Sequence, residues 1–179
     1  MKSGKSYELI SFFAPLNYTK LKFGLYQSQR NVRDSFVASR NGVQLEAKKI
    51  NSLFEILDDD VEVVGIDEVH MFKAEDILAI EELLKKGTQV IISGLDTDYQ
   101  GKLFDTIARL MELGPREIKY RRAVCEICQS PTAIYTQIFK DDQPITSGLP
   151  SVVPEDGTYR YAAVCRHCFR RQRESADSF

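Results

Sequence analysis

Apolar residues recur along the first two thirds of the chain in two rhythms, one typical of strands and one typical of helices. Short apolar runs predict strands over residues 20–26, 61–66 and 89–93. Helical spacing predicts helices over residues 6–16, 50–57, 74–86 and 103–113. Because strands separated by helices are typical of a parallel sheet, the pattern predicts an α/β fold.

Two local patterns add detail. The predicted helix over residues 74–86 carries apolar side chains on one side, and these are Ile77, Ile80, Leu83 and Leu84. Residues 36–38 and 43–45 are short apolar stretches around the sequence SRNG at 39–42. Because Asn-Gly favours a tight hairpin turn, this segment is predicted to be a β-hairpin.

The alternation ends near residue 118, where the composition changes. From Lys119 onward the chain carries two cysteine pairs and a segment rich in Pro, Gly and Asp over residues 141–157. Residues 170–179 show no periodicity, so a frayed tail is expected there. The predicted organisation is an α/β domain over 1–118, a cysteine-bearing subdomain over 119–171 and a flexible tail over 172–179.

Composition narrows the class of protein. The chain has 179 residues, 43% of them apolar and 28% charged, which is typical of a globular domain and not of a disordered chain. Lys and Arg number 24 against 26 Asp and Glu, so we expect no general nucleic-acid binding. No apolar run is long enough for a membrane span, and no secretory signal is evident. A cytoplasmic protein without a membrane partner is therefore expected.

The four cysteines form two Cys-x-x-Cys pairs, and they are Cys125, Cys128, Cys165 and Cys168. Paired spacings of this kind suit tetrahedral, structural Zn²⁺, whose four positions are then all filled by protein. Unrelated buried cysteines and a redox Cys-x-x-Cys remain as alternatives. Disulfides are not expected in a reducing compartment. The long stretch between the pairs predicts an inserted loop.

The N-terminal sequence Ser3-Gly4-Lys5-Ser6 before a predicted helix matches the second half of a phosphate-binding loop. In such a loop Gly4 lets backbone amides face phosphate oxygens, Lys5 meets the β- and γ-phosphates, and Ser6 ligates Mg²⁺. The first glycine of the motif would lie two positions before Met1, and the preceding strand is not in the sequence. The sequence therefore suggests either a start further upstream or a degenerate paralogue.

The segment Val63-Val64-Gly65-Ile66-Asp67-Glu68 is an apolar strand that ends in two carboxylates. This is the Walker-B pattern, in which Asp67 holds Mg²⁺ and Glu68 can serve as a general base. The alternative is an acidic strand end that faces solvent. Together with the phosphate-binding sequence, the pattern favours ATP or a related nucleotide as the ligand.

Several motifs in a fixed order resemble the type II thymidine kinase family over about residues 1–171. They are MKSGKS at 1–6, NVR at 31–33, SRNG at 39–42, GIDEVHMF at 65–72, GLDTDYQGKLF at 94–104, AVC at 123–125 and YAAVCRHC at 161–168. The resemblance implies a P-loop (RecA-like) parallel-sheet domain with a small zinc-ribbon and lasso subdomain. The zinc would anchor both ends of the lasso loop without touching substrate.

The same resemblance implies a reaction, the transfer of the ATP γ-phosphoryl group to the 5′-hydroxyl of thymidine. Glu68 would be the catalytic base, and Arg33 would stabilise charge on the phosphoryl group. The residues implied in ATP and Mg²⁺ binding are Ser3, Gly4, Lys5, Ser6, Arg33, Asp67, Glu68, Val69 and His70. The residues implied around thymine are Met1, Met71, Leu95, Tyr99, Phe104, Thr136 and Tyr161. A homotetramer is also implied.

The sequence departs from the family pattern at several positions. Lys2 stands where an aromatic is usual, Asn31 replaces an acidic residue, and Met71 replaces an aromatic. The sequence PEDG at 154–157 stands where I-G-G is usual. Two other functions therefore remain open. One is a catalytically impaired relative that acts as a nucleotide sensor or scaffold, and the other is a zinc-ribbon nucleic-acid module joined to an ATPase.

Overall fold

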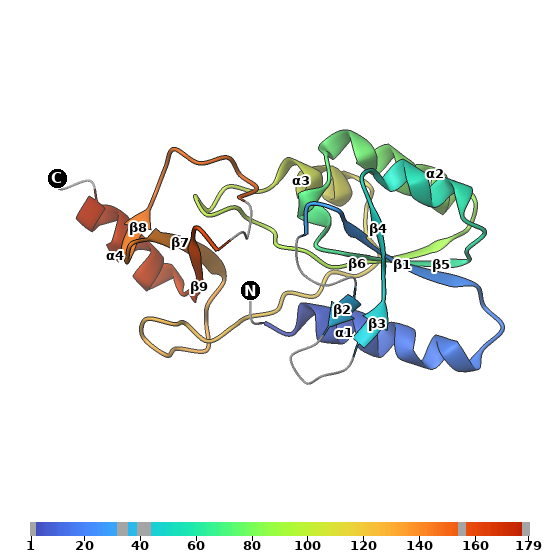
Figure 1. Ribbon diagram of the computed structural model, residues 1–179, viewed down its shortest axis with the longest axis horizontal. Helices are drawn as coiled ribbons and strands as arrows, with labels where there is room; N and C mark the ends of the chain where they lie inside the picture. The colour runs from blue at the N-terminus through green and yellow to red at the C-terminus, as the bar shows by residue number, and fades with distance from the viewer. Residues whose placement is uncertain (1–2, 32–35, 39–43, 154–156, 177–179) are drawn as a thin grey trace. The chain divides into compact units, whose positions relative to one another are not determined.

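The computed structural model describes residues 3–31, 36–38, 44–153 and 157–176, and the chain forms two compact units (Figure 1). The first, here called the sheet unit, comprises Lys5–Leu95 and Asp105–Arg116. The second, here called the cysteine unit, contains Met1–Gly4, Asp96–Phe104 and the chain from Glu117 onward. The division differs from the expected boundary near residue 118, because residues 96–104 group with the later part of the chain.

A four-stranded parallel sheet in the order β4-β1-β5-β6 forms the centre of the sheet unit. The strands are β1 (Phe23–Ser28), β4 (Lys48–Ile50), β5 (Val63–Asp67) and β6 (Gln89–Ile92). Every residue of β5 is buried, as an apolar strand between two neighbours and two layers of helix should be. The register sets Gln27 of β1 beside Asp67, so polar side chains gather at the carboxyl edge of the sheet.

Helices cover both faces of this sheet. Figure 1 shows α1 (Lys5–Phe13) on one face, with α2 (Ile77–Lys85) and α3 (Asp105–Glu112) on the other. Leu9, Ile10 and Phe13 of α1 pack with buried residues of β1 and β5. The opposite face holds the larger apolar cluster, which α2 and the 3-10 helix η2 (Leu53–Asp58) complete. Three further 3-10 turns are η1 (Ala14–Tyr18), η3 (Val69–Met71) and η4 (Ala74–Asp76).

A close approach at Gly65 sets the depth at which α1 packs on the sheet. A Cβ at Gly65 would lie 2.3 Å from Leu25 Cδ2 and 2.7 Å from Phe13 Cε2. Such distances are far inside van der Waals contact, so only glycine allows Phe13 to sit directly on β5. The same packing brings the first turn of α1 to the end of β5.

Most predicted elements of the sheet unit are present, and the differences have local causes. Residues 50–57 were predicted as one helix, but Ile50 ends β4 and the helical turn begins at Leu53, after the Ser52 cap. Leu84 was predicted on the buried side of α2, yet 47% of it is exposed, because Ile77, Ile80 and Leu83 already fill that face. Strands β2 (Phe36–Ala38) and β3 (Gln44–Glu46) pair as an antiparallel hairpin, while its predicted turn lies outside the described residues.

The cysteine unit contains a three-stranded antiparallel sheet in the order β8-β7-β9, which the sequence did not predict. The strands are β7 (Tyr135–Lys140), β8 (Gln143–Ile145) and β9 (Arg160–Val164). The turn between β7 and β8 uses Asp141 and Asp142 at positive φ, so these Asp residues make a hairpin turn and not the start of a long loop. The loop after β8, residues 146–153, is here called the lasso segment.

The chain after Cys165 forms helix α4 (Arg166–Ala176) instead of the frayed tail expected from residue 170. Its polar composition hid the pattern, since over residues 166–174, where burial is described, only Cys168 and Phe169 are buried. The helix is held by the cysteine unit and not by an apolar stripe of its own. Among the described residues, no helix combines the length and apolar character that crossing a membrane requires.

Candidate active site and metal centre

The phosphate-binding sequence lies at the start of α1, as predicted. Gly4 has a φ of +82°, a conformation that side chains other than glycine's rarely adopt, and helix α1 begins at Lys5. Free backbone amides and the helix dipole at this end favour an anion. Lys5 is half-buried within the sheet unit, so its ammonium group is partly shielded from water beside the helix end.

Asp67, at the end of β5, is the centre of a hydrogen-bonded cluster. Ser6 Oγ donates to Asp67 Oδ2 at 3.1 Å, and the Ser93 hydroxyl donates to Asp67 Oδ1. Burial and the neighbouring Glu68 carboxylate raise the pKa of Asp67, while the two serine hydroxyls and Lys5 oppose that rise. The two predicted Mg²⁺ ligands therefore touch each other directly, and oxygen donors of this type suit Mg²⁺.

Glu68 adopts a left-handed conformation, with φ 50° and ψ 45°. Such a backbone is unusual outside glycine, asparagine and aspartate, and it costs of order 1 kcal/mol or more. It ends the strand abruptly, and 22% of the Glu68 side chain remains exposed. One carboxylate is thus buried in the cluster and the next is open to an incoming group.

His70 is buried next to Glu68 and is neutral. Leu95 N donates to His70 Nδ1 at 3.2 Å, so Nδ1 carries no proton. Burial first, and then the Lys5 charge, lower the pKa of His70 to about 3. The 3.4 Å separation between His70 Nδ1 and Glu68 Oε2 is therefore not an ion pair.

The remaining predicted ATP-site residues are less informative. Val69 is buried, and its backbone N–H donates to Ser93 O at 3.0 Å, which joins the ends of β5 and β6. Arg33 and Met1 lie outside the described residues. Asn31, which precedes that gap, is buried and donates from Nδ2 to Gln27 Oε1 at 3.1 Å.

The predicted thymine-binding residues are divided between the two units. Met71 and Leu95 are half-buried in the sheet unit. Met71 follows His70 in the sequence, and the backbone N–H of Leu95 donates to His70 Nδ1. Tyr99, Phe104, Thr136 and Tyr161 belong to the cysteine unit, where the first three are buried. The structure therefore shows two separate groups of these residues, each within its own unit.

Tyr99 and Tyr161 form hydrogen bonds with the backbone of the lasso segment. Tyr99 is 2% exposed, and its hydroxyl both donates to Leu149 O and accepts from Leu149 N, each at 2.9 Å. Tyr161 Oη donates to Val153 O at 3.2 Å. Tyr99, Val153 and Ile138 share one apolar cluster with the side chains of Leu149 and Tyr161. Both tyrosines therefore have a structural task in addition to any contact with substrate.

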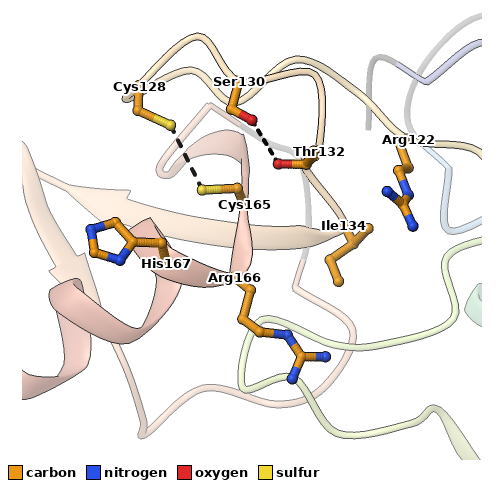
Figure 2. A pocket seen from close by; sticks show the side chains of 8 residues that line it. All are labelled: Arg122, Cys128, Ser130, Thr132, Ile134, Cys165, Arg166 and His167. Atoms are coloured by element: carbon orange, nitrogen blue, oxygen red, sulfur yellow. Dashed lines mark hydrogen bonds between the residues drawn. The ribbon is translucent and has the colours of Figure 1, made fainter.

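The four cysteines form a candidate metal centre within the cysteine unit. Their sulfur atoms all lie within 4.8 Å of one another, and Cys128 Sγ is 3.7 Å from Cys165 Sγ. Figure 2 shows these two sulfurs pointing toward each other from a loop and from the end of β9. Four thiolates at this spacing fit tetrahedral Zn²⁺, as the sequence predicted.

The electrostatics of the cluster also fit a divalent cation. Burial acts to raise the pKa of Cys125, but backbone N–H groups of Cys128, Cys165 and Ile127 lower it to about 6. Burial and the surrounding sulfur atoms raise the pKa of Cys168 to about 12. One thiolate forms readily and the last does not, because like charges repel. A bound Zn²⁺ supplies the charge that lets all four ionise.

A pocket of about 460 Å³ lies beside this cluster and not at the phosphate-binding end. It is lined by Arg122, Cys128, Ser130, Thr132, Ile134, Cys165, Arg166 and His167. In Figure 2 the guanidinium groups of Arg122 and Arg166 point away from the sulfurs, and Ser130 and Thr132 bond each other. Two of the lining residues are the candidate zinc ligands, so the hollow is part of the metal centre's surroundings.

Sequence reasoning missed two residues that the structure places in these sites. Ser93 follows β6 at the same sheet edge as Asp67, and the rule that parallel strands end together could have identified it. Arg173 was expected to be solvated in a frayed end, yet it is half-buried on α4 and bonds Tyr99 O and Gln137 Oε1. No local signal marks that role.

A family model described as thymidine kinase matches residues 1–169, which covers nearly the whole chain and both units. The match confirms the resemblance that the ordered motifs indicated.

Proposed function

The chain belongs to the thymidine kinase family and is an ATP-dependent nucleoside kinase with thymidine and ATP as its substrates, and we propose that the sheet unit carries the phosphoryl transfer. The observation that supports this most directly is the cluster at the end of β5, where Ser6 and Asp67 are hydrogen-bonded and Glu68 is the next residue. Phosphoryl transfer needs oxygen ligands for Mg²⁺ close to a general base, and these three side chains can supply both.

In this proposal the residues divide the chemistry among themselves. Lys5 and the amides at the start of α1 bind the β- and γ-phosphates, together with Ser3 and Gly4. Ser6 and Asp67 are the residues that would hold Mg²⁺, which neutralises phosphate charge when it is bound. Arg33 is proposed to stabilise charge on the transferred group.

Glu68 is proposed as the general base. The thymidine 5′-oxygen attacks the γ-phosphorus, its proton passes to the Glu68 carboxylate, and the bond between the γ-phosphorus and the bridging oxygen of ADP breaks. The partial exposure of the Glu68 side chain, next to the buried Asp67, supports this role, because a general base must be within reach of an incoming hydroxyl group. The neutral His70 leaves that carboxylate without a competing cation on this side.

For the nucleoside, we propose that the residues implied by the family contact thymine: Met1, Met71, Leu95, Tyr99, Phe104, Thr136 and Tyr161. The cysteine unit would support thymine binding indirectly, since the hydroxyl groups of Tyr99 and Tyr161 are hydrogen-bonded to the backbone of the lasso segment. Zn²⁺ held by the four cysteines is proposed to be structural. A homotetramer and a cytoplasmic location are proposed from the family resemblance, and four free cysteines agree with a reducing compartment.

The test of the proposed function is transfer of labelled phosphate from ATP to a panel of nucleosides. Labelled thymidine monophosphate that depends on both thymidine and a divalent cation is the expected product. Deoxyuridine, deoxycytidine and the ribonucleosides serve as matched alternatives for substrate choice. A folded, zinc-loaded protein that binds ATP and labels none of them would contradict the proposal.

A further inference from the structure

We propose that Arg173 of helix α4 is a positioning residue for thymidine binding, which it supports by holding the loop of residues 96–104 against the lasso segment. The inference rests on the proposed function, because it assigns Arg173 to the nucleoside side of that reaction. We assign Arg173 no contact with either substrate. It acts through Tyr99, whose carbonyl oxygen it binds.

Arg173 is held in one orientation by three kinds of contact. Its Nη2 donates to Tyr99 O at 2.5 Å, and its Nη1 donates to Gln137 Oε1 at 3.0 Å. The guanidinium carbon lies 3.5 Å from the centre of the Phe169 ring, one helical turn earlier on α4. A planar guanidinium can bond two acceptors and stack on a ring at the same time, which an ammonium group cannot.

Gln137 shows that this arrangement extends into the core of the cysteine unit. Its side chain is completely buried in β7. Its Nε2 donates to Ile138 O at 3.0 Å and to Ile145 O at 2.9 Å, while its oxygen accepts from Arg173. A buried amide with both ends bonded fixes the distance between α4 and the end of β8, where the lasso segment begins.

The loop of residues 96–104 is packed against the same aromatic stack. Phe169 and Tyr135 stack with ring centres 4.2 Å apart and planes 14° apart. A Cβ at Gly101 would lie 3.2 Å from Phe169 Cε1 and 3.4 Å from Tyr135 Cε1, so the backbone at Gly101 rests directly on this pair. Arg173 thus holds the loop at Tyr99 O, and the stack supports it two residues later.

Tyr99 passes the constraint on to the lasso segment. The carbonyl of Tyr99 is bound by Arg173, while its hydroxyl is bound to both backbone groups of Leu149. A second link, from Gln100 Nε2 to Thr146 O at 3.4 Å, runs beside it. Helix α4, the 96–104 loop and the lasso segment are therefore connected through consecutive hydrogen bonds within one unit.

This chain of contacts predicts an effect on one substrate only. Every residue in it belongs to the cysteine unit, whereas Lys5, Ser6 and Asp67 belong to the sheet unit. Ser3 and Gly4 group with the cysteine unit, but none of the contacts described above involves them. Loosening the loop and the lasso segment should therefore weaken thymidine binding and leave ATP binding intact. A residue that merely stabilised the fold would change neither Michaelis constant selectively.

The experiment compares Arg173→Ala and Arg173→Lys with Arg170→Ala, a matched control at an exposed position of the same helix. For Arg173→Ala we expect the KM for thymidine to rise about tenfold, as loss of a charge-assisted hydrogen bond implies. The KM for ATP, kcat and the zinc content should stay within about twofold of wild type. Arg173→Lys should recover only part of the loss, and Arg170→Ala should behave as wild type.

Backbone amide exchange gives a second readout that needs no substrate. In Arg173→Ala, amides of residues 96–104 and 146–153 should exchange faster, with Leu149 most affected, while those of β5 keep their protection. Tyr99→Phe offers an independent route if Arg173→Ala does not fold. It should speed exchange at Leu149 and raise the KM for thymidine without changing exchange in α4.

The two readouts separate the two claims. Equal rises in both KM values, or unchanged exchange at Leu149, would overturn the positioning role. A wild-type protein that phosphorylates no thymidine would overturn the proposed function instead, and the exchange rates would still decide whether Arg173 holds the loop and the lasso segment.

Discussion

The sheet unit and the cysteine unit obtain their order in different ways. In the sheet unit, a parallel sheet is buried under helices on both faces, and its reactive residues lie at the ends of elements that the apolar core fixes. The cysteine unit has a smaller core made largely of alanines, aromatics and the cysteines themselves. A core of that kind needs an added constraint. The comparison indicates that apolar packing positions the proposed site residues of the sheet unit, while hydrogen bonds and the proposed zinc site order the cysteine unit.

Removing the metal should have the largest effect, because it should unfold one unit and leave the other intact. Cys165→Ser should lose zinc and unfold the cysteine unit, because a structural zinc site contributes on the order of 10 kcal/mol to folding. The sheet unit should keep its helices and its ATP affinity. Metal analysis, circular dichroism and amide exchange would measure both effects.

The matched control for that change is His167→Ala, since His167 lies between two of the cysteines and is exposed. It should retain zinc and the fold. A Cys165→Ser protein that lacks zinc yet keeps the exchange protection of β7 and β9 would show that the cysteine unit does not depend on the metal.

Removing the proposed base should abolish chemistry in the sheet unit without disturbing either fold. Glu68→Gln keeps the size of the side chain but cannot accept the 5′-hydroxyl proton, so kcat should fall about 10³-fold while ATP still binds. Glu75→Gln, at an exposed position seven residues on, is the control. Steady-state rates and nucleotide titration would measure the difference, and an unchanged kcat would remove Glu68 from the mechanism.

Adding one methyl group should test how closely packing controls the sheet unit. In Gly65→Ala the new Cβ would collide with Leu25 and Phe13, so the free energy of unfolding should fall by about 2 kcal/mol. Helix α1 should shift, and ATP affinity should fall with it because Lys5 begins that helix. Chemical denaturation and ATP titration would show this. Zinc content is the internal control, and a stable variant with normal ATP affinity would contradict the inference.

The smallest effect concerns a charge pair at the rim of the sheet unit. The pKa of Asp59 lies below its ordinary value. The hydrogen bond from Lys48 lowers this pKa most, partial burial opposes it by raising the pKa, and the hydrogen bond from Tyr26 lowers it further. A lowered folded-state pKa contributes stability above the ordinary pKa, and that stability is lost as the pH falls through the folded value. Asp59→Asn should therefore flatten the acid side of the stability curve by about half a kcal/mol.

Denaturation of wild type and Asp59→Asn from neutral to acidic pH would measure this contribution. Asp58→Asn, at a neighbouring exposed position, is the control. Parallel curves for wild type and Asp59→Asn across the acidic range would show that the Asp59 contacts do not contribute.

The sequence predicted the sheet unit better than the cysteine unit, for a physical reason. Lys5, Ser6, Asp67 and Glu68 sit at the ends of elements with strong apolar periodicity, so their order along the chain nearly determines their arrangement. The four cysteines were predicted from spacing alone. The strands β7, β8 and β9 were missed because β8 has only three residues and contains a proline, and because β9 pairs with β7 across the long loop that contains the lasso segment.

Long-range contacts set the limit of that reasoning. Tyr99 was predicted to contact thymine, and that stays a prediction, but its two hydrogen bonds with Leu149 join residues 50 positions apart. Arg173 bonds Tyr99 across 74 positions. No local pattern carries such information, because the partner is chosen by tertiary packing. The left-handed conformation of Glu68 was equally invisible, since glutamate does not favour it.

The four cysteines of the metal centre are not equally shielded, since Cys128 is exposed while Cys125, Cys165 and Cys168 are buried. An alkylating or oxidising reagent in solution therefore meets the cluster through one sulfur atom. With the metal in place that sulfur is a bound thiolate, which reacts slowly, and after metal loss it becomes the accessible member of the set. The labelling rate of a single side chain thus reports whether the whole unit is assembled.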